Sequence, residues 1–597
     1  MARKIAGWIA GPIGGELPFF CLMVFALFFS HFLWSITPGG VRGLSLMQWR
    51  NVGIAFSAPV FMAWGLCVLL HGCRRAGLRR SLKVLLYALA SLLMLADLLL
   101  LWGFGTLLSP WMLMLLAETN GNEACEFLTQ NLLTANSMKA YGLLLLYGLT
   151  AFALERRWRG GTLSLPRQSA VAVAVAPFLA VGAYLFLLTA RLPLLRTQYD
   201  FEAWHERRGF YAKQCTPTNL LYSALYLRVT RQDNALAIRS SQQAFRQPAT
   251  CAEGDTLCVV LVIGESFSKW HTPLYGYDLA TTPRLCALRD SGNLFVFSDA
   301  VTPYNLTTFS VKNILSTNSL ADGEPWHARP ALPVIFKKAG FHVSVWDNQR
   351  PGGADVSTYD YALGSYMYAP QMLPIAYDEW NTSTYTYDGD LVEAQRQRLG
   401  QQQASGHSHR LSLHIVHLMG QHSDAACRFP HTEGMLAFGP EDIRRTDLSE
   451  TERQAVADYD NATRYNDLVV GRIVDTFKEK PAVMLYVSDH GEEVYDYRHF
   501  LGRSHEHRKS REALRCQYEI PFLVWCSDRY MEAHPGQVEA IRKAQEKPLS
   551  ADDLAHTLFS LAAIATPYYQ SRHDVLSHDY VPGPRIVGGS TGYDNCY

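Results

Sequence analysis

The chain has 597 residues, and its 54 basic and 54 acidic side chains leave no net charge. This length is too great for one ordinary domain, and the balanced charge excludes a global basic field that recruits nucleic acid. Hydrophobic residues form long runs before residue 190, whereas the rest of the chain has mixed polarity. The sequence therefore predicts a membrane part followed by a more polar part.

Five apolar runs in the first third of the chain have the composition of membrane-spanning helices, which need about 20 residues. They are Leu17–Ile36, Val52–Leu70, Val84–Leu107, Ala140–Leu154 and Ala170–Leu188. The fourth run is short, but Met138 and the start of the basic segment that follows can extend it. A buried helix of a soluble protein is rarely so apolar on every face, so we predict a transmembrane domain of five helices over residues 1–190.

Basic residues gather at the start of the chain and in alternate loops, at 74–83 and 155–167. Because an excess of Lys and Arg marks cytoplasmic loops, the N-terminus is expected in the cytoplasm. After five spans, everything beyond Ala190 then lies outside the cytoplasm. No small-residue cleavage site follows the first span, which we interpret as an anchor and not as a removed signal peptide.

Residues 191–250 mix aromatic side chains with many arginines. This composition suits amphipathic helices lying at the membrane interface, and a linker with its own packing is an equally good interpretation. Outside the cytoplasm, an oxidising compartment allows disulfides. Cys251 and Cys258 are the closest pair that could form one.

From about Leu257 onward, short apolar runs alternate with helical stretches, which is typical of an α/β layered domain with a mostly parallel sheet. We assign this domain to residues 251–597. The predicted strands are Leu257–Ile263, Phe341–Val345, Leu411–Leu418, Ala482–Val487 and Ile520–Trp525. The longest predicted helix is Ser449–Lys478, and Asp552–Ala563 is predicted as the last one.

Two of these strands end in side chains that can bind a metal ion. Glu265 follows the first strand, and Asp489, His490 and Glu492 follow the fourth. Buried parallel strands deliver functional groups at their carboxyl edge, and a mixed Asp, His and Glu set suits zinc, with manganese as second choice. Alternatively, Glu265 is a helix N-terminal acid and the Asp489 segment is a surface turn, although a turn would not explain the apolar run before it.

Several histidines could join such a site. His422 lies just past the end of a predicted strand, where site residues collect, while His414 and His417 lie on that strand and are more simply core residues. His499, with His505 and His507, forms a cluster after Asp489, for which an exposed loop is the alternative for the last two.

A nucleophile is expected between the two metal-binding strand ends. Thr307 and Thr308 precede an apparent helix at Phe309–Leu315. A hydroxyl at a helix N-terminus lies among N–H groups that bind phosphate, and a metal ion would lower its pKa. Either threonine could equally be a plain N-cap, and these residues alone do not separate the two uses.

Four motifs together resemble the membrane phosphoethanolamine transferases, the group that includes the lipid A enzymes behind polymyxin resistance. They are Gly264-Glu265-Ser266, Leu274-Tyr275-Gly276-Tyr277 with Thr282-Pro283, Met419-Gly420-Gln421-His422, and Ser488-Asp489-His490-Gly491-Glu492. The resemblance covers nearly the whole chain. It implies five membrane helices, an interfacial linker and a sulfatase- or alkaline-phosphatase-like domain in the periplasm of a bacterial inner-membrane protein.

The resemblance also implies a reaction: phosphoethanolamine passes from phosphatidylethanolamine to a threonine, releasing diacylglycerol, and then to a lipid A or lipopolysaccharide core sugar. One zinc ion would be bound tightly by Glu265, Asp489, His490 and the nucleophile, which the family spacing back from Ser316 places at Thr307. A second zinc is possible. The other residues carried over are His422 and His499 for a second zinc or the phosphate, Glu492 as a nearby acid, and Thr119 and Glu123 for the ethanolamine head group.

The sequence departs from the family pattern at three places. Pro303 and Asn313 stand where many relatives carry a cysteine pair beside the nucleophile, and Leu115 replaces a common Asn near Thr119. The alternatives are a phosphoglycerol transferase similar to lipoteichoic acid synthase, transfer to another glycan, or a membrane sensor with a degenerate site. A sulfatase proper is disfavoured, because no C/S-x-P-x-R motif occurs at the Thr307 segment. We expect a monomer that does not bind nucleic acid.

Overall fold

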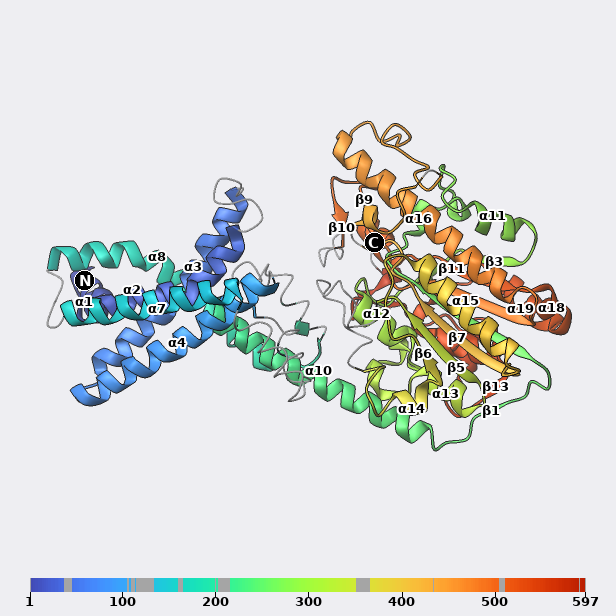
Figure 1. Cartoon of the computed structure of the whole chain (residues 1–597), viewed down its shortest axis with the longest axis horizontal. Helices are drawn as coiled ribbons and strands as arrows, with labels where there is room; N and C mark the ends of the chain where they lie inside the picture. Colours follow the sequence, from blue (N-terminus) through green and yellow to red (C-terminus); the bar gives the residue numbers. More distant parts are fainter. Residues whose placement is uncertain are drawn as a thin grey trace. The chain divides into compact units, whose positions relative to one another are not determined.

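The computed structural model describes residues 2–36, 46–104, 107–108, 113, 134–158, 165–198, 200–201, 204, 215–349, 366–422, 424–432, 434–503, 510–589 and 591–595. The chain forms two compact units, Met1–Arg231 and Gln232–Tyr597 (Figure 1). We describe each unit by itself. The domain limits predicted near residues 190 and 250 stay predictions.

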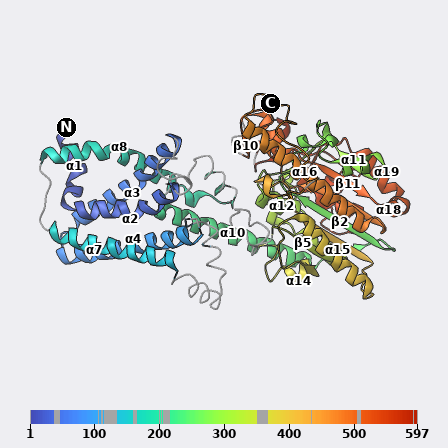
Figure 2. The ribbon, with the colours of Figure 1, turned by 45° about the horizontal axis from the view of Figure 1, so that its top comes forward.

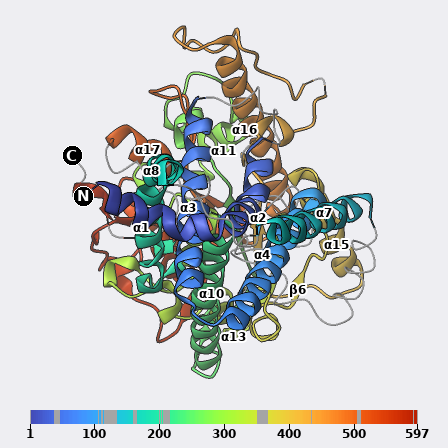
Figure 3. The ribbon, with the colours of Figure 1, turned by 90° about the vertical axis from the view of Figure 1, so that its left-hand side faces the viewer.

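The first unit is a bundle of helices, drawn in blue to blue-green in Figure 3. The helices of the bundle are α1 (Ala2–Gly15), α2 (Leu17–Ile36), α3 (Leu46–Gly72), α4 (Ala76–Phe104), α7 (Ala135–Arg157) and α8 (Leu165–Thr189). Five segments are long and apolar enough to cross a membrane: Leu17–Ile36, Trp49–Gly72, Ala76–Trp102, Ser137–Arg157 and Arg167–Leu194. The five predicted spans are thus confirmed. The third span begins at Ala76, earlier than the predicted Val84. Its first turns therefore contain basic residues that we had placed in a loop.

A buried carboxylate joins the end of α4 to the start of the long helix α10 (Thr216–Ala244). Asp97 accepts hydrogen bonds from the hydroxyl of Thr216 at 2.5 Å and from the backbone N–H of Leu108 at 3.1 Å. Only 2% of Asp97 is exposed. A carboxyl group in an apolar bundle is costly unless it is bonded, so this contact fixes the start of α10 within the first unit.

The second unit is built on a sheet of seven strands in the order β3-β11-β8-β2-β7-β5-β6. In that order the strands are Leu294–Phe297, Phe522–Cys526, Ala482–Ser488, Leu257–Gly264, Leu411–His417, His342–Asp347 and Glu379–Trp380. Five of them are the strands that the sequence predicts. Strand β11 pairs antiparallel with both β8 and β3, while the other pairings are parallel. The prediction of a mostly parallel sheet is confirmed.

Helices cover both faces of this sheet, because every residue of the central strand β2 is buried and successive side chains point to opposite faces. Val259, Leu261 and Ile263 belong to one apolar core, and Val260 and Val262 to the other. The second core is covered by α11 (Pro283–Asp290), α15 (Asp388–Ala404) and α16 (Glu450–Phe477), of which α15 and α16 lie side by side in Figures 1 and 2. The first is covered by α12 (Thr307–Ile314), α13 (Leu332–Lys338), α19 (Pro535–Ala544) and α20 (Leu554–Leu561).

Short elements complete the second unit. The small paired strands are β1 (Thr250–Cys251) with β13 (Ile564–Ala565), β4 (Ala300–Val301) with β12 (Leu549–Ser550), β9 (Glu493–Val494) with β10 (Leu501–Gly502), and β14 (Ile586–Val587) with β15 (Thr591–Gly592). The short helices are α14 (Leu373–Ala376), α17 (Arg511–Tyr518) and α18 (Asp528–Ala533).

The disulfide considered between Cys251 and Cys258 is absent, because both side chains are free. Cys258 is buried in β2, between β7 and β8. The thiol of Cys251, on β1, instead donates to the carbonyl oxygen of Ala562 at 3.2 Å. The two cysteines therefore lie on strands of different sheets.

Candidate metal and nucleophile site

The parallel register brings the two predicted metal-binding segments together. Ile263 of β2 is paired with Val487 of β8, and Gly264 with Ser488, so Glu265 and Asp489 follow neighbouring strand ends. The backbone turns sharply there, since Ser266 has a φ of 56° and its N–H donates to Asp489 Oδ1 at 3.0 Å. The carboxyl edge predicted from the sequence is thus the place where these side chains meet.

Glu265, Asp489 and His490 are fully buried, and one ligand atom of each lies within 4.8 Å of the others. His490 Nε2 lies 3.4 Å from Glu265 Oε1 and 3.1 Å from Asp489 Oδ2. His490 Nδ1 lies 3.0 Å from the carbonyl oxygen of Gly491. Because a carbonyl only accepts, the ring proton belongs on Nδ1, so Nε2 carries a lone pair. Arg503 Nη1 contacts this lone pair here, and a bound metal ion would take the place of that contact.

A second observation shows that Glu265, Asp489 and His490 fit a metal ion. Asp489 Oδ2 is buried without a hydrogen-bond donor, and a buried carboxylate oxygen of that kind needs a positive partner. Burial raises the pKa of the Asp489 carboxyl, while the N–H of Ser266 lowers it. Two carboxylates and an imidazole at one buried point are a donor set that zinc accepts.

Thr307 is the first residue of α12 and lies at this cluster. Its hydroxyl donates to Glu265 Oε2 at 2.9 Å and lies 3.1 Å from His490 Nε2. The N-cap of the helix is Leu306, so Thr307 is not the capping residue. The hydroxyl of Thr307 therefore contacts two of the three candidate metal ligands. A hydroxyl acting as a nucleophile in this position would have a carboxylate and an imidazole beside it.

Glu492 and Arg503 lie beside the cluster as an ion pair, with Arg503 Nε 3.1 Å from Glu492 Oε2. Arg503 Nη1 also contacts His490 Nε2 and lies 3.3 Å from the carbonyl oxygen of Asn305. Burial raises the pKa of Glu492 to about 7, although the charge of Arg503 lowers it. Arg503 is a site residue that no sequence motif indicated. Its place within the histidine cluster, between His499 and His505, is the signal that could have found it.

A second missed residue, Gln349, holds Glu265 in place. Its side-chain amide donates to Glu265 Oε2 at 3.0 Å and to the carbonyl oxygen of Leu418 at 2.8 Å. Asp347 accepts from the backbone N–H of Gln349 at 2.8 Å and from His417 Nδ1 at 2.9 Å. Burial lowers the pKa of His417, but Asp347 outweighs it and the pKa is raised. His417 therefore supports the site from the core and is not part of the ligand group.

Gly420 allows the β7 loop to approach Glu265 closely. Its φ is +48°, and a Cβ at this position would lie 2.6 Å from the backbone oxygen of Glu265. The backbone N–H of Gln421 donates to the same oxygen at 3.0 Å. The motif Met419–His422 is thus a loop packed against the first metal-binding strand end.

The other predicted site residues have different positions. His422 is buried in the loop that contacts Glu265. The side chain of His499 is 59% exposed and lies 2.8 Å from Glu452 at the start of α16. Thr119 and Glu123, like His505 and His507, lie outside the described residues, and the roles given to all of these residues stay predictions.

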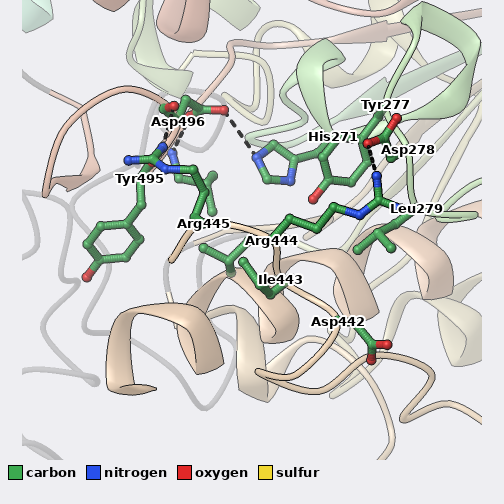
Figure 4. A pocket seen from close by; sticks show the side chains of 12 residues that line it. His271, Tyr277, Asp278, Leu279, Asp442, Ile443, Arg444, Arg445, Tyr495 and Asp496 are labelled. Carbon is green, nitrogen blue, oxygen red and sulfur yellow. Dashed lines mark hydrogen bonds and ion pairs between the residues drawn. The ribbon is translucent and has the colours of Figure 1, made fainter. Parts of the chain in front are cut away.

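A pocket of about 280 Å³ lies at the turn of the β9–β10 hairpin. The side chain of His271 at its wall lies 3.3 Å from Asp496 (Figure 4). It also lies 2.7 Å from Asp460. Arg445 also contacts this turn, through the backbone oxygens of Tyr495 and Asp496. Burial lowers the pKa of His271, but the two carboxylates together raise it to about 10. The hairpin thus joins the Glu492–Arg503 pair at its base to this pocket at its tip.

Comparison with known proteins gives a consistent picture. Residues 258–564 match the family model described as Sulfatase. Phosphoethanolamine transferase EptC of Escherichia coli (strain K12) is 27% identical over 495 residues, which are 81% of this chain and 80% of that protein. Kdo(2)-lipid A phosphoethanolamine 7''-transferase of the same strain is 27% identical over 349 residues, 57% of each chain. The matched family region includes both metal-binding strand ends and Thr307.

One solved structure is also similar, that of the C-terminal periplasmic domain of EptC from Escherichia coli in complex with Zn. It has 26% sequence identity to this chain and a TM-score of 0.49. The match covers 58% of this chain and 96% of that domain.

Proposed function

The chain belongs to the sulfatase family, and from this membership we propose that it is a membrane phosphoethanolamine transferase with Thr307 as nucleophile. The observation that carries the proposal is the contact of the Thr307 hydroxyl with both Glu265 and His490. Two relatives that are 27% identical to this chain over 495 and 349 residues bear the name of this activity. Five apolar helices and the basic loops between them favour an inner-membrane protein with its catalytic unit in the periplasm.

We infer one zinc ion at Glu265, Asp489 and His490, with Thr307 as a further ligand. When bound, zinc supplies positive charge that lowers the pKa of a hydroxyl and stabilises charge on a phosphoryl oxygen. The protein side of this arrangement is already fixed. Ser266 and Gln349 hydrogen-bond Glu265, and Gly491 sets the tautomer of His490.

The first step transfers phosphoethanolamine to the enzyme. The oxygen of Thr307 bonds to the phosphorus of phosphatidylethanolamine and loses its proton, while the bond from phosphorus to the glycerol oxygen breaks. Diacylglycerol leaves with a proton on that oxygen. Thr307 begins α12, whose dipole favours negative charge at this place.

The second step regenerates the enzyme. A hydroxyl of the acceptor bonds to the same phosphorus and gives up its proton, and Thr307 leaves and regains one. We propose a lipid A or lipopolysaccharide core sugar as acceptor, because one relative is named for transfer to Kdo(2)-lipid A. A membrane-anchored enzyme and a membrane-embedded acceptor share the same surface.

The test uses the full-length protein in detergent with fluorescent phosphatidylethanolamine and, separately, phosphatidylglycerol. We expect diacylglycerol release from the first lipid and a phosphoethanolamine adduct on Thr307 in the mass spectrum. Thr307→Ala should lower release by at least about 100-fold, since removing a nucleophile removes the covalent path. Thr308→Ala is the matched control from the same helical turn and should retain activity.

Two results would contradict the proposal. Release from phosphatidylglycerol alone would favour a phosphoglycerol transferase. Equal activity of wild type and Thr307→Ala would remove Thr307 as the nucleophile. The acceptor is tested by mass spectrometry of lipid A from cells with and without the protein.

A further inference from the structure

Arg503 lies at the nucleophile although no motif points to it. It directly follows β10, and its guanidinium lies 3.3 Å from the Asn305 carbonyl oxygen and pairs with Glu492. Its contact with His490 Nε2 would give way to a bound zinc ion, whereas the other two contacts do not involve the zinc ligands. Its side chain is 16% exposed and that of Glu492 is 8% exposed. Asn305 stands two residues before Thr307. A permanent positive charge is therefore fixed next to the hydroxyl that receives the phosphoryl group.

The charges of the site leave room for this cation. Glu265, Asp489 and Glu492 are buried carboxylates around Thr307. One divalent metal ion and one guanidinium together balance three carboxylates. A second divalent ion would leave an excess of positive charge in a buried site, which is unfavourable until an anion arrives.

Among the described residues, one group of three side chains could hold a metal ion. Its members are Glu265, Asp489 and His490. His422, predicted for a second zinc or the phosphate, is buried in the loop beside Glu265. The side chain of His499, predicted for a second zinc, instead lies 2.8 Å from Glu452 and is largely exposed. Arg503 cannot be a metal ligand, because a guanidinium has donors and no free lone pair.

We propose that Arg503 takes the place of a second metal ion: it binds the non-bridging oxygens of the transferred phosphoryl group, and the enzyme holds one zinc per chain. This inference rests on the proposed function, because it names what neutralises the phosphoryl group at the same site. Arginine suits the role, since its planar fork matches phosphate and stays protonated. Glu492 orients the fork through Nε.

In the reaction, Arg503 stabilises negative charge and takes no part in proton transfer. The phosphorus gains a bond to Thr307 and loses one to glycerol, and negative charge stays on its non-bridging oxygens throughout. Arg503 donates hydrogen bonds to them and transfers no proton. It would act in the same way when the acceptor hydroxyl attacks.

The experiment uses the full-length protein in detergent and measures two quantities that do not require turnover. Zinc per chain is measured by inductively coupled plasma mass spectrometry after loading and desalting. The affinity for inorganic phosphate is measured by isothermal titration. We expect one zinc in wild type and in Arg503→Gln, and phosphate binding weakened about 10- to 100-fold in Arg503→Gln, the usual worth of a charge-assisted hydrogen bond. The phosphate affinity of Arg503→Lys should lie between those of wild type and Arg503→Gln.

Arg498→Gln is the matched control. Arg498 lies on the same hairpin and also pairs with a buried carboxylate, Glu493 at 2.7 Å. If Arg503 only holds the hairpin in place, both arginine variants should weaken phosphate binding equally, and the proposal is wrong. Arg503→Lys, which keeps the charge, provides the same comparison if Arg503→Gln does not fold.

Two zinc ions per wild-type chain, or phosphate affinity unchanged in Arg503→Gln, would also overturn it. Neither measurement uses a lipid. Failure of wild type to release diacylglycerol from phosphatidylethanolamine would instead count against the proposed function, and phosphate titration would still report on Arg503.

Discussion

Gln349 acts on Glu265 in the same way that a carboxylate or carbonyl orients a metal-bound histidine. Its amide bridges Glu265 Oε2 and the Leu418 carbonyl oxygen, so it fixes one strand end relative to the end of β7. Mutation of groups that orient metal ligands in this way typically lowers metal affinity about 10- to 100-fold.

We predict that Gln349→Leu weakens zinc binding about 10- to 100-fold, because Glu265 loses the donor that holds it. Competition with a chelator of known affinity measures this. The matched control is Gln397→Leu, which removes a hydrogen bond of the same length, 3.0 Å, to the exposed carboxylate of Glu393. Equal zinc affinity in the Gln349 variant and wild type would show that Glu265 needs no such support.

At the scale of elements, the β9–β10 hairpin connects two parts of the second unit. Glu493 and Val494 continue directly from Glu492, and Leu501 and Gly502 lead directly into Arg503. At the other end, the side chain of Asp496 pairs with that of His271. His271 lies shortly after the candidate metal ligand Glu265 in the sequence. A short hairpin has little core of its own, so its position depends on these contacts at both ends.

The His271 pair predicts a pH dependence of stability. The folded pKa of about 10 lies above the ordinary value of 6.5, so the stabilisation is complete below about pH 6.5 and is lost as the pH rises through 10. Urea unfolding at pH 6, 8 and 10, followed by tryptophan fluorescence, should show wild type losing more stability than His271→Gln. At pH 6 the variant should be less stable by about 3–5 kcal/mol, the usual cost of breaking a buried pair. Parallel pH curves for the two proteins would contradict a charged His271.

For the whole molecule, the positions of the basic loops predict which segments face the cytoplasm. In a cysteine-free background, Arg80→Cys and Asp255→Cys place single thiols at exposed sites of the first and second unit. A membrane-impermeant maleimide added to intact spheroplasts should label Asp255→Cys and spare Arg80→Cys until the membrane is permeabilised. The opposite labelling would place the catalytic unit in the cytoplasm and exclude a periplasmic enzyme.

Much of the fold was predictable because its signals are local. The five apolar spans and five of the seven strands of the sheet depend on runs of neighbouring residues, whose hydrophobic pattern is visible without tertiary contacts. The orientation of β11 was not predictable in this way. An antiparallel strand inside a parallel sheet has the same buried, apolar sequence as its neighbours, and its direction depends on how the chain returns.

The candidate site shows the same division. The sequence by itself determined that Glu265 and the Asp489-His490 pair end buried strands, because an abrupt change from apolar to ligating residues is a local feature. The family resemblance pointed to Thr307, but only the tertiary structure shows its hydroxyl in contact with Glu265 and His490, since these contacts join residues 42 and 183 positions apart. The places of Gln349 and Arg503 depend likewise on segments distant in the chain, and a single polar side chain carries no mark in the sequence of the partner it will find.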